Sequence, residues 1–159
     1  MATFGEPGDA VLDELEGLLG TSNADEHWTC PDPNGEVRFV MWADLGVFVI
    51  DGVFTGWVDA IYFPPEYGPL LELNTVEELH IGVELEHWEA HLGDRFAFRE
   101  PDPSAAPDPS AEPDPVPRAD TRGFDIDGPD GIHGIVEDSA EGSRVIALSA
   151  GTTCFDNAP

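Results

Sequence analysis

The stretch that decides the fold runs from Glu36 to Phe63 and reads EVRFVMWADLGVFVIDGVFTGWVDAIYF. It carries few charges, and its Val, Ile, Phe, Trp and Tyr side chains favour a pleated, half-buried sheet surface. Asp51-Gly52 separates two of its apolar runs, and Asp-Gly typically fills a two-residue hairpin turn in which both residues have positive φ. The stretch therefore predicts three strands joined as an antiparallel meander, near residues 37–42, 45–50 and 53–62.

The segment before the meander predicts a helix. Three leucines recur at i, i+3 and i+7 and so share one face of a 3.6-residue period: Leu12, Leu15 and Leu19. Asp9 is the predicted N-cap of this helix, and Gly20 is its predicted C-terminal stop. Residues 21–35, which include a Pro-Asp-Pro-Asn-Gly run, are predicted to be a loop.

The second half of the chain repeats this order with weaker hydrophobicity. A helix is predicted over residues 82–93, where Leu85, Trp88 and Leu92 have the same spacing before a closing glycine. Three strands are predicted after it, at residues 123–126, 132–137 and 144–149. We therefore predict an α+β fold of two tandem units, each a helix plus a three-stranded antiparallel meander, packed as one domain.

The predicted organisation has four parts. The first helix–meander unit covers residues 4–63, a connector covers 64–81, and the second unit covers 82–154. An insertion at residues 100–122 repeats Pro-Asp-Pro-Ser-Ala and carries almost no large apolar side chains. A segment of this composition cannot bury enough apolar surface to fold, so we predict that the insertion is disordered.

The net charge limits the classes of partner. The chain has 33 Asp and Glu residues against 6 Arg and no Lys, which makes a formal charge of −27. A field of this sign repels nucleic acid and anionic membrane surfaces, so we expect neither as a partner. No apolar run approaches the roughly 20 residues that span a bilayer, and we expect no signal peptide in the sequence as it stands. The excess of acidic residues is explained either by solubility or adaptation to salt, or by attraction to a basic partner.

Cys30 and Cys154 are the two cysteines, one before the first predicted meander and one after the second. In an oxidising compartment a bridge between them would close a loop of about 125 residues and contribute about 4–5 kcal/mol in the chain-entropy model. No flanking residue indicates a thiol with a lowered pKa. We favour a structural disulfide over two free thiols, and both over a catalytic or metal-binding pair.

Catalytic signatures are weak. The sequence has no nucleophile elbow, phosphate loop or dinucleotide fingerprint. His87 and His91 lie at i, i+4, a spacing that zinc sites use, but they flank the predicted apolar stripe of the second helix. We interpret them as residues at the edge of a helix face. We therefore expect no cofactor, no metal and no catalysis.

A second pattern resembles a calcium loop with one extra residue. It consists of Asp125, Asp127, Asp130-Gly131 and Glu137. A calcium loop of this kind is flanked by helices, whereas the flanks here predict strands. A turn between two strands is the favoured interpretation.

Four tryptophans raise the question of a binding surface. Trp88 belongs to the predicted helix stripe, and Trp42 shares a strand face with Arg38. If that face meets solvent, Arg38, Trp42 and Trp57 would form a protein-binding surface, because Trp and Arg dominate interface hot spots. The alternative is that all four indoles are core.

The overall pattern resembles an uncharacterised family of actinobacterial secreted proteins and lipoproteins. The resemblance covers nearly the whole chain except the proline-rich insertion. The matching elements are Phe4-Gly-x-Pro, Leu15-x-x-x-Leu19-Gly, Cys30-Pro, Arg38 with Trp42-x-Asp-Leu45, Phe54-x-Gly-Trp57, Ile81-Gly-Val, Leu92-Gly-Asp and Ala150-Gly-x-x-Cys154.

Such proteins look like tandem copies of the helix-plus-meander unit of β-lactamase inhibitory protein and of SmpA/OmlA-type outer-membrane assembly lipoproteins. The resemblance implies an extracytoplasmic setting, a disulfide between the units and a binding role, and it supplies no functional residue to transfer. The setting follows if an upstream signal has been removed; otherwise the chain is cytoplasmic.

Our leading hypothesis is a non-catalytic protein-binding module of the cell envelope or exterior, whose partner is another protein. One alternative is a strongly acidic inhibitor or immunity-type protein that neutralises a basic partner. The least favoured alternative is a small metal-dependent hydrolase that uses His87 and His91. The pattern does not address the oligomeric state.

Overall fold

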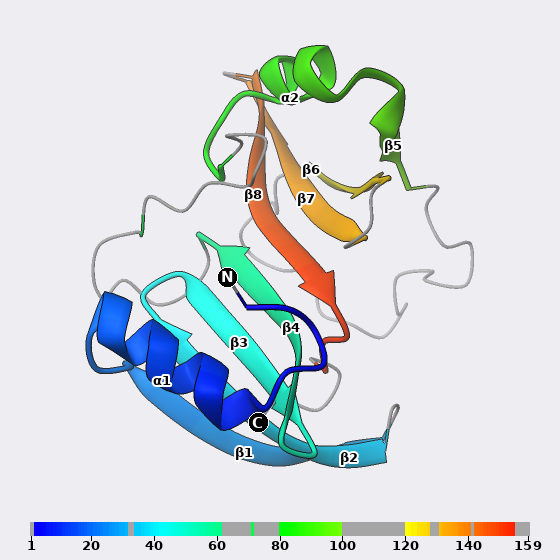
Figure 1. The fold of residues 1–159 in the computed structure, drawn as a ribbon. Coiled ribbons are helices and arrows are strands. Elements are labelled where there is room, and N and C mark those ends of the chain that lie inside the picture. The colour runs from blue at the N-terminus through cyan, green and yellow to red at the C-terminus, as the bar shows by residue number, and fades with distance from the viewer. Residues whose placement is uncertain are drawn as a thin grey trace, which may run out of the picture. The chain divides into compact units, whose positions relative to one another are not determined.

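The computed structural model describes residues 2–31, 34–61, 71, 80–99, 120–127, 131–140 and 142–154. Within these ranges the chain forms two α-helices, a short 3-10 helix and eight strands (Figure 1). The elements are α1 (Gly8–Leu19), β1 (Ala24–Pro31), β2 (Asn34–Trp42), β3 (Leu45–Ile50), β4 (Val53–Ala60), α2 (Leu85–Leu92), η2 (Gly93–Arg95), β5 (Phe96–Phe98), β6 (Asp120–Ile126), β7 (Ile132–Ser139) and β8 (Gly142–Gly151).

The prediction of two units with three-stranded meanders is wrong, although the α+β class holds loosely. The eight described strands belong to one antiparallel sheet, in the order β1-β2-β3-β4-β8-β7-β6-β5. Two of these strands were not predicted, β1 and β5, and they are the two edges of the sheet. Most of β1 is exposed, so it lacks the alternation of apolar and polar residues that marks a half-buried strand. β5 has only three residues.

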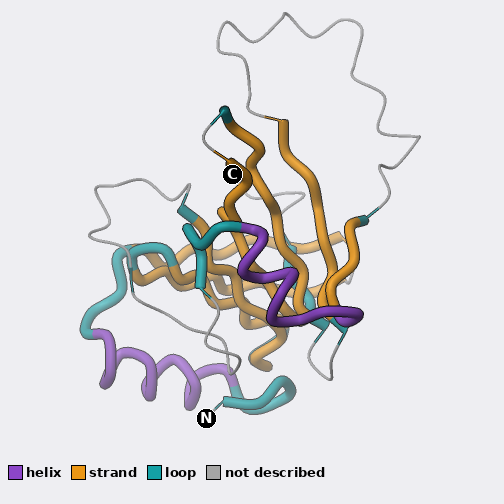
Figure 2. The backbone as a smooth tube through the Cα atoms, turned by 90° about the horizontal axis from the view of Figure 1, so that it is seen from above, coloured by secondary structure: helices purple, strands orange, loops and turns teal. Residues whose placement is uncertain are grey.

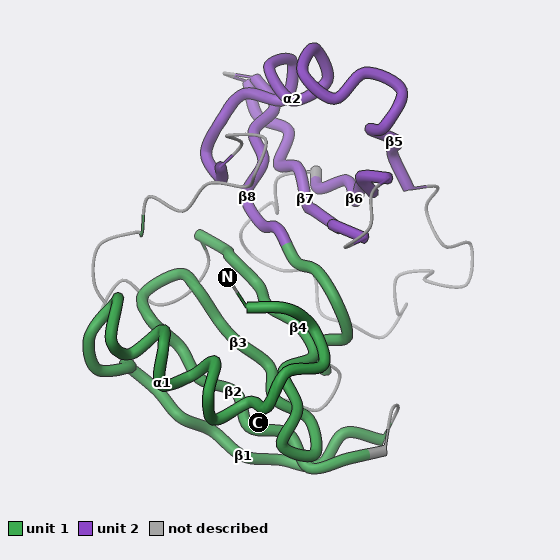
Figure 3. Tube along the Cα trace, in the orientation of Figure 1, with its two compact units in different colours: residues 1–73, 149–159 green, residues 74–148 purple. Residues whose placement is uncertain are grey.

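The chain divides into two compact units that differ from the predicted boundaries. Unit 1 comprises residues 1–73 and 149–159, and unit 2 comprises residues 74–148 (Figure 3). The division therefore falls inside the predicted connector 64–81, of which Leu71, His80 and Ile81 are described. Residues 100–119 of the predicted insertion lie outside the described residues, and residues 120–122 begin β6.

In unit 1, α1 packs on one face of the strands. Its leucine stripe is confirmed, because Leu12 is buried in an apolar cluster against which Leu15 and Leu19 pack. Gly20, with φ 86°, ends the helix as predicted. The N-cap is Pro7 rather than Asp9, because the N–H of Gly8 donates to the carbonyl oxygen of Gly52 (2.8 Å) and so fixes where the helix begins.

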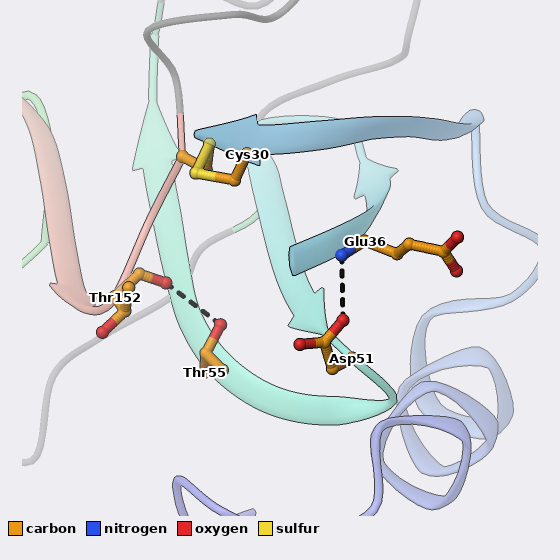
Figure 4. Close-up of a disulfide and its surroundings, with 6 residues drawn as sticks. Cys30, Glu36, Asp51, Thr55 and Thr152 are labelled. Atoms are coloured by element: carbon orange, nitrogen blue, oxygen red, sulfur yellow. Dashed lines mark hydrogen bonds between the residues drawn. A yellow bond between two sulfur atoms is a disulfide. The ribbon is translucent and has the colours of Figure 1, made fainter. Parts of the chain in front are cut away.

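The predicted Asp51-Gly52 turn is confirmed. Both residues have positive φ, 50° and 79°, as this hairpin turn requires. The Asp51 carboxylate also accepts a hydrogen bond from the N–H of Glu36 (2.9 Å, Figure 4). The side chain of Asp51 thus ties the β3–β4 turn to β2.

In unit 2, α2 lies beside the strands of its own unit (Figure 2). The predicted stripe is confirmed, because Leu85, Trp88 and Leu92 are all buried. The Trp88 ring packs against Phe124 of β6, with ring centroids 5.9 Å apart. Gly134 of β7 leaves room for the Phe124 ring, since an added Cβ would meet it at 2.1 Å.

Candidate functional site

The prediction of a Cys30–Cys154 disulfide is confirmed, but both cysteines lie in unit 1, so the bond does not join two units as the resemblance implies. Cys30 near the end of β1 is bonded to Cys154, three residues after β8, across a sequence separation of 124 (Figure 4). Both cysteines are buried. The bond therefore ties an edge strand to the C-terminal segment, and it excludes the alternative of two free thiols.

The C-terminal segment is also hydrogen-bonded to β4. The N–H of Thr152 donates to the Thr55 carbonyl oxygen (2.8 Å), and the Thr55 hydroxyl donates to the Thr152 carbonyl oxygen (3.1 Å, Figure 4). An added Cβ at Gly56 would lie 2.6 Å from the Thr152 carbonyl oxygen and 2.9 Å from that of Ala150. Glycine is therefore required at position 56, where two stretches of backbone meet.

Trp42, a predicted residue of the partner-binding surface, is core. Its side chain is only 3% exposed and lies in the apolar cluster under α1. Its indole Nε1–H donates to the carbonyl oxygen of Gly20 (2.8 Å), where α1 ends. Trp42 therefore holds the end of the helix against the sheet, and its burial excludes it as an exposed binding residue.

Arg38 and Trp57 lie on the same side of the sheet as α1. The Arg38 guanidinium donates to the Asp25 carboxylate through Nε (3.0 Å) and Nη2 (2.8 Å), and to Asp9 through Nη1 (3.1 Å). Trp57, half-buried, packs against the apolar cluster opposite Val47. Both side chains contribute to the packing of α1 against the sheet. Their role toward a partner stays a prediction.

The Arg38 hydrogen bonds lower the pKa of Asp25, with a smaller effect from the charge of Arg38. The carboxylate therefore stays ionised to a lower pH than an unpaired Asp would, and the three charged groups connect α1, β1 and β2. Arg38 lies on the face that α1 covers, and the network gives its charge two carboxylate partners there.

The other sequence candidates are spread over unit 2. His87 and His91 are both exposed on α2, on either side of buried Trp88. Asp125 and Glu137 of the calcium-like pattern lie on β6 and β7, while Asp130 lies outside the described residues. Among the residues that the structure describes, no three His, Cys, Asp or Glu side chains are grouped so that they could hold a metal ion.

A cluster that sequence reasoning missed lies on β6 and β7. Asp125 and His133 are directly opposite each other in the strand register, with Asp125 Oδ1 2.6 Å from His133 Nδ1. Arg99 follows β5, and its Nη2 donates to the same Asp125 oxygen (2.5 Å) and lies 3.2 Å from His133 Nδ1. We call Arg99, Asp125 and His133 the Asp125 cluster. Only Asp125 had been considered from the sequence, and as a calcium ligand.

The backbone fixes the position of Arg99 in this cluster. Its N–H donates to the carbonyl oxygen of Gly123 (2.9 Å). Its side chain crosses Gly123, where an added Cβ would make ordinary van der Waals contact with it. Arg99 thus passes over the β6 backbone at Gly123 and reaches Asp125, and the space there would also accommodate a Cβ.

The cluster lies on the face of unit 2 that α2 does not cover. Trp88 of α2 packs on Phe124, whose side chain points to the opposite side of β6 from its neighbours Gly123 and Asp125. Ile135, opposite Gly123, is on the uncovered face and is 41% exposed. We call this surface, made by Arg99, Asp125, His133 and Ile135, the open face.

The Asp125 cluster is suited to recognition. The hydrogen bond from Arg99, then that from His133, lower the pKa of Asp125, so its carboxylate stays charged to a lower pH than an unpaired Asp would. Within the described residues His133 Nδ1 donates to Asp125, so it cannot also accept from Arg99 Nη2, which lies 3.2 Å away, and no hydrogen bond joins His133 to a hydroxyl or thiol that it could activate. The arrangement offers fixed donors and acceptors beside an apolar side chain.

Comparison of the chain with protein family models, with curated proteins and with solved structures found no match. The resemblance to secreted actinobacterial proteins therefore stays a prediction. None of the described helices is both long and apolar enough to cross a membrane.

Proposed function

We propose that the chain is a non-catalytic protein-binding module that meets its partner through the open face of unit 2. The observation that carries this proposal is exposed Ile135 beside the hydrogen-bonded Asp125 cluster. Protein interfaces combine a central apolar contact with a polar rim whose hydrogen bonds are satisfied. Side chains that are already held on strands lose little conformational entropy when a partner binds.

We further propose that the module works outside the cytoplasm. The support is the buried Cys30–Cys154 disulfide, since such bonds form and persist in oxidising compartments. Envelope and secreted proteins of the source organism are therefore the pool in which to search for a partner.

The test uses a charge placed in the open face. Ile135→Arg puts a long cation beside Arg99, and Leu18→Arg is the matched control, because Leu18 is 74% exposed on α1. Each variant is cross-linked to envelope and secreted proteins, and the affinity of any captured partner is then measured. We expect Ile135→Arg to weaken binding at least tenfold, or about 1.4 kcal/mol. A partner that Leu18→Arg loses and Ile135→Arg keeps would contradict the proposal.

A second candidate is an acidic protein that neutralises a basic partner through its field. The observation in its favour is that three described arginines, Arg38, Arg99 and Arg122, are already paired with carboxylates of this chain. Exposed acidic residues of both helices remain, among them Asp13, Glu16, Glu86 and Glu89. Salt separates the candidates: screening of such a field should weaken binding steeply between low and high ionic strength, whereas contact through Ile135 should change little.

A further inference from the structure

Two aspartates of unit 1 are buried where a charge is costly. Asp44 lies in the turn between β2 and β3, and Asp59 lies on β4 opposite Leu45. They are 1% and 3% exposed, and they are the buried charged residues of the described part of the chain. Neither was a candidate site residue from the sequence, because 33 acidic residues make any adjacent pair uninformative.

Backbone groups hold Asp44 in place. Its Oδ1 accepts a hydrogen bond from the N–H of Leu71 (2.7 Å), and its carbonyl oxygen accepts one from the N–H of Ala60 (3.1 Å). Leu71 in turn packs against the apolar cluster of unit 1. Asp44 therefore joins the β2–β3 turn, the end of β4 and Leu71.

One donor is missing from this arrangement. Asp44 Oδ2 and Asp59 Oδ1 are buried, and among the described residues they have no hydrogen-bond partner. Two ionised carboxylates that are buried side by side repel each other, and both lose their hydration. A single proton between the carboxyl groups removes one charge and supplies the donor that the oxygens lack.

The electrostatics agree with this geometry. Burial first, and then the charge and hydrogen bond of Asp44, raise the pKa of Asp59 to about 8. In the described part of the chain Asp44 is the titratable group that acts on Asp59, and no described cation contributes. Leu45, which faces Asp59 in the register, and Leu71 both belong to the apolar cluster.

We propose that Asp44 and Asp59 share one proton and that this proton keeps Leu71 bound to unit 1. We call these three residues the latch, and the latch loosens when the proton leaves. With the proton bound, Asp59 donates to Asp44, which also accepts from Leu71. Loss of the proton leaves two adjacent buried charges, and water must enter to solvate them. The turn at Asp44 and the hydrogen bond to Leu71 then open. This latch is independent of the open face of unit 2.

The test compares wild type with Asp59→Asn, whose amide keeps a donor toward Asp44 and cannot ionise. The matched control is Asp51→Asn, an exposed carboxylate in the next hairpin turn. Folding constants are measured by denaturant titration from pH 5 to 9 at constant ionic strength. Since the folded state binds the proton more tightly, the wild-type constant should fall about tenfold per pH unit relative to Asp59→Asn up to about pH 8, then level off. Asp51→Asn should follow wild type.

A second measurement needs no variant and so does not depend on Asp59→Asn folding. Carboxyl ¹³C NMR of the wild type should show an aspartate that titrates close to pH 8. Hydrogen exchange at Leu71 and Ala60 should accelerate above that pH by more than the intrinsic base catalysis.

Two results would overturn the proposal. One is a set of parallel pH profiles for wild type and Asp59→Asn, with every aspartate titrating below pH 5. The other is stabilisation of wild type by millimolar calcium or magnesium that Asp59→Asn loses and Asp51→Asn keeps, because the occupant would then be a metal ion.

Discussion

Arg38 of unit 1 and Arg99 of unit 2 make the same kind of bond to an aspartate but lie on different kinds of surface. Arg38 bonds Asp25 and Asp9 on the side of the sheet that α1 covers, and so connects three elements. Arg99 bonds Asp125 beside His133 on the face that α2 leaves uncovered. The ion pair of Arg38 thus connects α1 to two strands, whereas the ion pair of Arg99 lies on a face without a described helix and is the more exposed of the two.

The two units also differ in how their chain is restrained. Unit 1 has the Cys30–Cys154 disulfide, the Thr55–Thr152 hydrogen bonds and the buried carboxyl pair. Unit 2 has its described apolar core under α2, centred on Trp88 and Phe124, and exposes the Asp125 cluster. We therefore attribute stability chiefly to features of unit 1, and our proposal places partner binding on unit 2. Substitutions in each unit should separate these two properties.

The largest expected effect comes from removing the disulfide. The double variant Cys30→Ala/Cys154→Ala should lose about 4–5 kcal/mol of unfolding free energy, because the bond closes a loop with a sequence separation of 124. Urea titration measures the loss, and wild type in reductant serves as the control. A loss below about 1 kcal/mol would show that the bond does not restrain the unfolded chain as this model requires.

The next effect distinguishes core from surface among the tryptophans beside α1. Trp42→Ala should cost about 3–5 kcal/mol, since it empties a buried site and frees the carbonyl oxygen of Gly20. Trp57→Ala, at a half-buried position, should cost less than half as much. Thermal and denaturant unfolding of both variants test this order, and equal losses would contradict the placement of Trp42 in the core.

The smallest effect concerns the arginines. Arg38→Gln should cost about 1 kcal/mol or less at pH 7, because the pair is partly exposed. Asp25 has a lowered pKa in the folded state, so this contribution is present above the pKa of the unfolded carboxyl, about 4. It is lost as the pH falls through the folded pKa.

Arg99→Gln should leave stability nearly unchanged and weaken partner binding. Loss of stability in Arg99→Gln together with loss of partner binding in Arg38→Gln would contradict these roles.

Local signals in the sequence predicted the local structure well. The Asp51-Gly52 turn, the stripes of both helices and the strands β2, β3 and β4 each follow from neighbouring residues alone. The edge strands did not, because β1 exposes most of its side chains and β5 is too short to show a period. The disulfide was predicted because only two cysteines exist to pair.

The candidate sites depended on contacts between distant residues. Trp42 shares one strand face with Arg38, and the sequence does not say which face α1 will cover. The Asp125 cluster needs β6 and β7 in register and Arg99 laid across Gly123. Asp44 and Asp59 are two of 33 acidic residues, and only burial distinguishes them.

The most direct test of the division between the units is side-chain oxidation footprinting with and without a captured partner. The reporters are His133 on the open face and Trp57 beside α1. We predict that the partner protects His133 and leaves Trp57 unchanged, because the open face carries the contact. Protection of Trp57 with His133 unchanged would place the partner on unit 1 and contradict the account.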